Sequence, residues 1–123
     1  LLQGVKQAKP AVEDELISVE LIDAFSRFIA FVLDAVAVKD AADFEQEIQQ
    51  QLRQKGFAQH SNEALGSPEF AASLPISSYA FIITAVYEIF CEFYGPMRAD
   101  QVYAQSKLKI KSLYPDVDLH QLL

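Results

Sequence analysis

Three carboxylates are placed where they could act together. Asp34 interrupts an apolar run, and Glu88 and Glu92 lie one helical turn apart in a second apolar segment. If the two segments form neighbouring helices, the carboxylates could converge on a metal ion or a proton. Di-metal sites in helical bundles, however, add a Glu-x-x-His motif, and neither segment contains a histidine. We therefore expect these carboxylates to mark the solvent-facing edges of their helices.

The other reactive side chains lack partners at useful spacing. His60 and His120 fall in predicted turns, without a set of metal ligands around them. Cys91 is followed by Glu92, and an acidic neighbour does not favour a reactive thiolate. There is also no glycine-rich phosphate loop. These patterns predict a protein that is not an enzyme and has no catalytic residues, no metal site and no cofactor.

Composition narrows the class of protein further. The 123 residues are 51% hydrophobic and 22% charged, which favours a single folded domain over residues 1–123 and argues against disorder. A net charge of −7 argues against nucleic-acid binding. A single cysteine excludes an internal disulfide and favours a cytoplasmic location.

Two further expectations concern the start of the chain and membranes. The sequence does not begin with Met, so we interpret it as a piece of a longer chain whose residues 1–10 form a flexible leader. The densest apolar run covers residues 28–38 and is too short for a bilayer, which needs roughly 20 apolar residues. The longest stretch without a charged residue, 70–87, is interrupted by Pro75 and several serines. We expect no membrane-spanning helix.

Glycines and prolines divide the chain into helices. Apolar residues at helical spacing predict helices over 12–38, from the Asp40 cap to Gly56, over 79–94 and over 98–114. Ser67-Pro68-Glu69 opens a short helix that Pro75 stops, residues 57–66 form a loop, and a final turn reaches Leu122. The β-prone runs 36–38 and 81–86 are assigned to helices because longer helical patterns contain them. The fold class is all-α: an antiparallel bundle of about four long helices plus one or two short ones.

The helices predicted over 12–38 and 79–94 are apolar almost all the way round. Such helices are central to a core, or they bury a second face against another chain or an apolar ligand. The candidate contact residues on them are aromatic: Phe25, Phe28, Phe31, Tyr79, Phe81, Tyr87 and Phe90. On the last long helix Lys107, Lys109 and Lys111 form either a solvated face or a charged docking stripe.

These features together favour one function and leave a second open. The surplus apolar helix surface predicts a non-enzymatic regulatory or adaptor domain that acts through helix-mediated protein–protein contacts, as a homodimer. The alternative is a binding module for a hydrophobic small molecule held between the two apolar helices.

Overall fold

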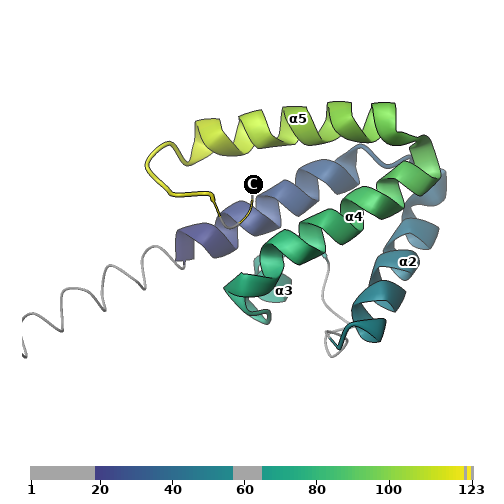
Figure 1. The fold of residues 1–123 in the computed structure, drawn as a ribbon, viewed down its shortest axis with the longest axis horizontal. Helices are drawn as coiled ribbons and strands as arrows, with labels where there is room; N and C mark the ends of the chain where they lie inside the picture. The colour runs from purple at the N-terminus through teal and green to yellow at the C-terminus, as the bar shows by residue number, and fades with distance from the viewer. Residues whose placement is uncertain (1–18, 57–64, 121, 123) are drawn as a thin grey trace, which may run out of the picture.

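The structure is a computed structural model that describes residues 19–56, 65–120 and 122. The described part is an all-α bundle, as expected (Figure 1). Its elements are a first helix over residues 19–34, η1 (Val38–Asp40), α2 (Ala41–Gln54), α3 (Pro68–Ala72), η2 (Ile76–Ser78), α4 (Tyr79–Tyr94) and α5 (Pro96–Leu113). Each long helix turns back relative to the one before it, so consecutive long helices are antiparallel. The predicted leader 1–10 and most of the predicted loop 57–66 lie outside the described residues.

The first helix ends at residue 34, four residues before the predicted end at 38. Ala37 is extended, with φ −61° and ψ 144°, and a 3₁₀ turn follows it. The Tyr94 hydroxyl accepts a hydrogen bond from the Ala37 N–H at 3.0 Å and donates one to Asp40 Oδ2 at 2.7 Å. The β-prone run that we had assigned to a helix therefore leaves the helix, because a side chain 57 residues away takes its backbone donor.

The helix boundaries that depend on local chemistry lie close to their predicted positions. The Ser67 side chain accepts from the Phe70 N–H at 3.2 Å and caps α3, with Pro68 in the first turn. Gly56, after α2, has a positive φ of 90°. Asp40 precedes α2, but its side chain makes no cap hydrogen bond there and is bound by Tyr94 instead.

Helix α4 has its predicted bounds, and α5 begins at Pro96, two residues earlier than predicted. Gly95 separates them with φ 88° and ψ 158°, a conformation open to glycine. Pro96 then takes the first helical turn, where its missing N–H costs no hydrogen bond. The connection between two long helices is a single residue, and α5 returns along α4 (Figure 1).

The core is formed by one face of each helix. Phe25 stacks on Tyr79 at 4.0 Å between ring centroids, and Phe44 of α2 meets Phe90 of α4 edge-on at 5.9 Å. The Tyr114 hydroxyl, after α5, donates a hydrogen bond to the Asp23 carboxylate of the first helix. The first helix, α2, α4 and the end of α5 are thus tied together by aromatic side chains.

One stretch, Ile76–Tyr94, is long and apolar enough to cross a membrane by length and composition alone, whereas we had expected no such stretch. In the structure it forms η2 and α4, and 39% of it is buried inside the protein. α4 packs against both α2 and α5, and its buried positions belong to the core of the bundle.

Candidate functional site

The aromatic residues predicted to meet a partner divide into two groups. Four of them are fully buried in the core of the single chain: Phe25, Phe28, Tyr79 and Phe90. Their packing within the bundle accounts for the apolar character that had suggested a shared face. A partner could reach them only if the bundle opened.

The other three aromatic side chains reach the surface at separate places. Phe81 of α4 is 43% exposed, with Lys55 Nζ at 5.7 Å from its ring centroid. Phe31, on the first helix, is partly buried under Lys109, whose Nζ lies 5.0 Å from the ring centroid. Tyr87 lines a groove between α4 and α5. These three side chains therefore do not form one continuous surface.

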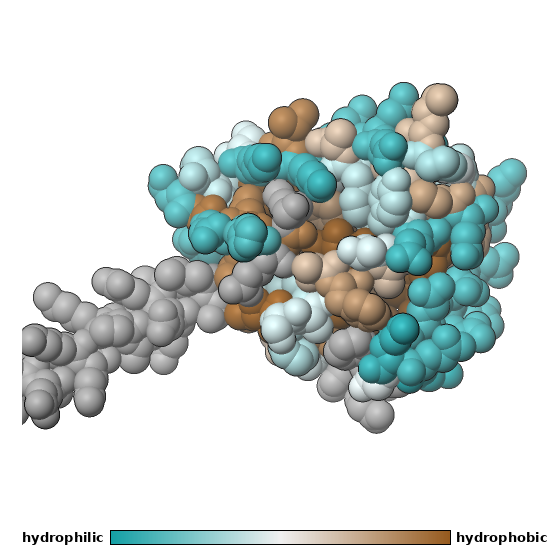
Figure 2. Space-filling model, in the orientation of Figure 1, coloured by the Kyte–Doolittle hydropathy of each residue, from teal (hydrophilic) through white to brown (hydrophobic). Residues whose placement is uncertain are grey.

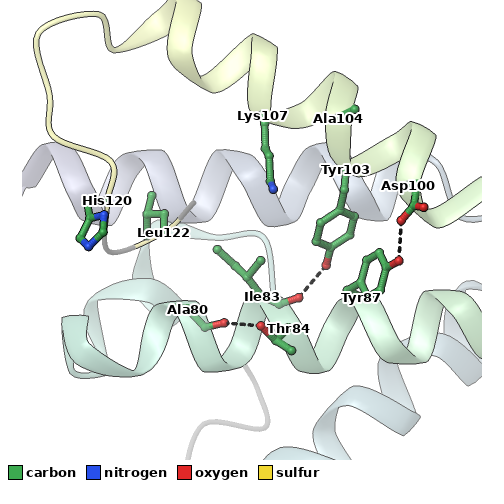
Figure 3. Close-up of a pocket in the computed structure, with 10 residues that line it drawn as sticks. All are labelled: Ala80, Ile83, Thr84, Tyr87, Asp100, Tyr103, Ala104, Lys107, His120 and Leu122. Atoms are coloured by element: carbon green, nitrogen blue, oxygen red, sulfur yellow. Dashed lines mark hydrogen bonds between the residues drawn. The ribbon is translucent and has the colours of Figure 1, made fainter. Parts of the chain in front are cut away.

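The three lysines predicted to form a docking stripe also point in different directions. Lys109 reaches toward the first helix and covers Phe31. Lys107 lines the groove on the other side of α5, and its amine points into that groove (Figure 3). Lys111 is exposed. A spacing of two residues turns a helix by roughly 200°, so Lys109 lies on the other side of α5 from Lys107 and Lys111, which are one helical turn apart.

Helix α5 carries the largest share of exposed apolar side chains. Among the described residues six large hydrophobic side chains are exposed, and three of them, Met97, Leu108 and Leu113, are on α5. Met97 and Leu108 are 79% and 68% exposed. Together with the exposed Ala104 they lie on one line, seven and four residues apart, on the side of the helix opposite its buried face. We call Met97, Ala104 and Leu108 the α5 ridge; apolar side chains stand out over α5 in Figure 2.

A shallow hollow of about 450 Å³ lies beside the α5 ridge, where α5 meets the first helix. It is lined by Phe31, Leu108, Lys109, Ser112 and Leu113. Its walls are mostly apolar, and the Lys109 amine closes one side of it over the Phe31 ring. The hollow and the α5 ridge share Leu108, so they adjoin one another.

On the other flank of α5 a groove of about 670 Å³ runs between α4, α5 and the C-terminal segment (Figure 3). Ile83 and Leu122, both buried, form much of its apolar wall. The Tyr103 hydroxyl donates to the Ile83 carbonyl at 2.7 Å, and the Tyr87 hydroxyl donates to Asp100 Oδ1 at 2.5 Å. Figure 2 shows apolar side chains in the hollowed area between these helices.

Both groove tyrosines have a raised pKa, for different reasons. The hydrogen bond to Asp100, followed by one to Cys91, raises the pKa of the Tyr87 hydroxyl. Burial raises the pKa of Tyr103. Both phenols therefore stay protonated at neutral pH, and their protons are directed at protein acceptors rather than at the groove.

Between the first helix and α4 the described residues border a void that is much smaller than this groove. The void bordered by Ile29, Ile48, Leu65, Phe70, Ile82 and Val86 does not admit a water molecule. The predicted alternative, an apolar ligand held between these two helices, gains no support from this void.

The side chains considered first for chemistry remain apart. No group of three His, Cys, Asp or Glu side chains within residues 19–56 and 65–120 could hold a metal ion, so Asp34, Glu88 and Glu92 do not converge. All three are exposed. Cys91 is half-buried and free, and His60 lies outside the described residues.

Sequence reasoning missed Met97, Leu108 and the groove. The exposed line of Met97, Ala104 and Leu108 could have been found by projecting residues 96–113 onto a helix, because these residues fall opposite Val102, Ser106 and Ile110. The groove could not have been found in this way, since Leu122 and His120 come from the segment after α5 and reach it through the chain reversal at Pro115.

Comparisons with known proteins yield no match. No family model, no curated protein and no solved structure is significantly similar to the chain.

Proposed function

We propose that this chain is a non-enzymatic adaptor domain that associates with a second copy of itself through helix α5. The observation that supports the proposal is the α5 ridge: exposed apolar side chains in a line on a helix whose opposite face is already in the core. Exposed apolar side chains that gather along one face of a helix mark interaction sites more often than scattered exposed residues do.

The spacing along the ridge favours a two-fold symmetric arrangement. Met97 and Leu108 lie at opposite ends, eleven residues and roughly 16 Å apart along the helix axis. When two α5 helices pack antiparallel, Met97 of one copy meets Leu108 of the other, twice in the dimer, and Ala104 near the middle permits close approach. The flexible Met97 side chain then enters the hollow beside Phe31 of the second copy.

The size of this surface limits the expected affinity of the dimer. A single helix face with its adjoining hollow is smaller than the about 1,600 Å² that a standard stable interface buries. We therefore expect a reversible dimer with a dissociation constant of about 1 µM or weaker. Such an association depends on concentration, which suits a regulatory contact.

The chain offers a direct reporter of this contact, because Met97 is its single methionine. Protein labelled with ¹³C in the methionine methyl group gives one methyl signal. We expect that signal to shift with protein concentration and to stop shifting in Leu108→Glu, which places a charge opposite Met97 of the second copy.

Val38→Glu is the matched control for this experiment. Val38 is 95% exposed and lies in η1, and it belongs neither to the α5 ridge nor to the hollow beside it, so its replacement removes an exposed apolar side chain outside the proposed contact. The Met97 signal of this variant should still shift with concentration. A methyl signal independent of concentration in the unmodified chain, or equal shifts in Leu108→Glu, would contradict the proposal.

A further inference from the structure

The polar groups around the groove between α4 and α5 are unequally available to a ligand. The Thr84 hydroxyl donates to the Ala80 carbonyl at 3.0 Å, and the Tyr87 and Tyr103 hydroxyls donate to Asp100 and Ile83 (Figure 3). All three hydroxyl protons are therefore engaged by the protein. The side-chain donors left to face the groove are nitrogens, on Lys107 and His120.

Lys107 is placed to receive an anion. Its side chain is half-buried against the groove, its amine points into the space (Figure 3), and no carboxylate among the described residues forms an ion pair with it. His120 lies at the far end of the groove, on the segment after α5, and Leu122 stands between it and Lys107 (Figure 3). The middle of the groove therefore presents the Lys107 amine, which has no ion-pair partner among the described residues.

The end of the groove at Asp100 has the reverse character. Asp100 lies seven residues before Lys107 on α5, roughly 10 Å away along the helix axis. Its carboxylate accepts a hydrogen bond from the Tyr87 hydroxyl, and a carboxylate at this position repels an anion. Apolar side chains form much of the remaining wall: Ala80, Ile83, Ala104 and Leu122. A ligand with its anionic group at Lys107 and its apolar part toward Asp100 has its negative charge beside the amine and away from the carboxylate.

We propose that this groove binds an amphipathic carboxylate, with the carboxylate at Lys107 and an apolar chain along Ile83 and Ala104. The volume of about 670 Å³ falls in the range of small-ligand sites. The site adjoins the contact proposed above at Ala104, which belongs to the α5 ridge and also lines the groove, whereas neither Met97 nor Leu108 lines it.

Decanoate is a suitable probe, with 1-decanol as the uncharged control of the same chain length. In calorimetric titrations below the micelle concentration, the unmodified protein should bind decanoate saturably and at least about tenfold more tightly than decanol. Lys107→Gln should weaken decanoate binding about tenfold or more and leave decanol binding unchanged. Lys109→Gln, which removes a lysine that lies over Phe31 on the other side of the same helix, should have little effect.

A second pair of variants tests the apolar part of the site. Ala80 is exposed and lines the groove, so Ala80→Trp fills the space without entering the core and should abolish binding of both probes. Gln50→Trp places the same side chain on an exposed position of α2 and should bind as the unmodified protein does. Repeating the titration in Leu108→Glu separates this site from self-association: decanoate should bind that variant equally well.

The proposal is overturned if decanoate does not bind, if decanol binds as tightly as decanoate, or if Lys107→Gln binds decanoate like the unmodified protein. Unchanged binding in Ala80→Trp would also overturn it, because the ligand would then lie elsewhere.

Discussion

The most informative stability prediction concerns Tyr79. This side chain is fully buried, stacks on Phe25 at 4.0 Å, and donates a hydrogen bond to the Ala71 carbonyl at 2.7 Å. Burial raises its pKa from 10.0 to about 12. The unfolded chain therefore releases the Tyr79 proton from about pH 10, while the folded chain holds it to about pH 12. The stability that this group contributes is complete below pH 10 and is lost as the pH rises toward 12.

Two magnitudes follow for Tyr79→Phe. At neutral pH the variant loses one hydrogen bond, and Ala71 keeps a second donor, the Leu74 N–H at 3.2 Å, so the cost is about 1 kcal/mol. Between pH 10 and 12 the unmodified protein loses about 2 kcal/mol through this tyrosine, and the variant does not. The two stability curves should therefore cross at about pH 11, with the variant more stable above the crossing.

Urea unfolding at a series of pH values from 7 to 11.5 measures both curves. The other four tyrosines and the lysines are common to the two proteins, so their contributions cancel in the difference. A constant difference between unmodified protein and Tyr79→Phe across this range would refute the argument, because it would mean that Tyr79 ionises equally readily in the folded and unfolded chains.

Two further substitutions test the connections between helices. Tyr94→Phe removes the hydroxyl that bonds the Ala37 N–H and Asp40. We expect the free energy of unfolding to fall by about 1–2 kcal/mol and hydrogen exchange at the Ala37 amide to become faster. An unchanged exchange rate would contradict this role. In Gly95→Ala the added Cβ meets no atom within 4 Å, so the whole cost comes from holding alanine at φ 88° and ψ 158°. We expect a loss of about 1–3 kcal/mol in the free energy of unfolding, measured by thermal unfolding. An unchanged unfolding midpoint would contradict this expectation.

The sequence was informative where local chemistry decides the structure. Ser67 and Pro68 start α3, Gly56 follows α2 with a positive φ, and α4 has its predicted bounds, because caps, prolines and glycines act over a few residues. The first helix was predicted four residues too long because its end depends on Tyr94, which no local pattern connects to Ala37. Contacts across the bundle of this kind are invisible to helical periodicity.

The candidate site was less predictable than the fold. The apolar sequence of two helices suggested a face shared with a partner. The structure instead buries four of the aromatic residues within the single chain: Phe25, Phe28, Tyr79 and Phe90. The lysines were grouped by their proximity in sequence, although a two-residue spacing places Lys107 and Lys109 on different sides of α5. The surfaces proposed for a partner and for a ligand both involve α5, a helix of mixed polar and apolar sequence.

Sedimentation equilibrium of the unmodified chain, from micromolar to millimolar concentration, tests self-association most directly. We predict a weight-average mass that rises from 13.8 kDa toward twice that value as the concentration increases. A mass that stays at 13.8 kDa across the whole range would contradict the account.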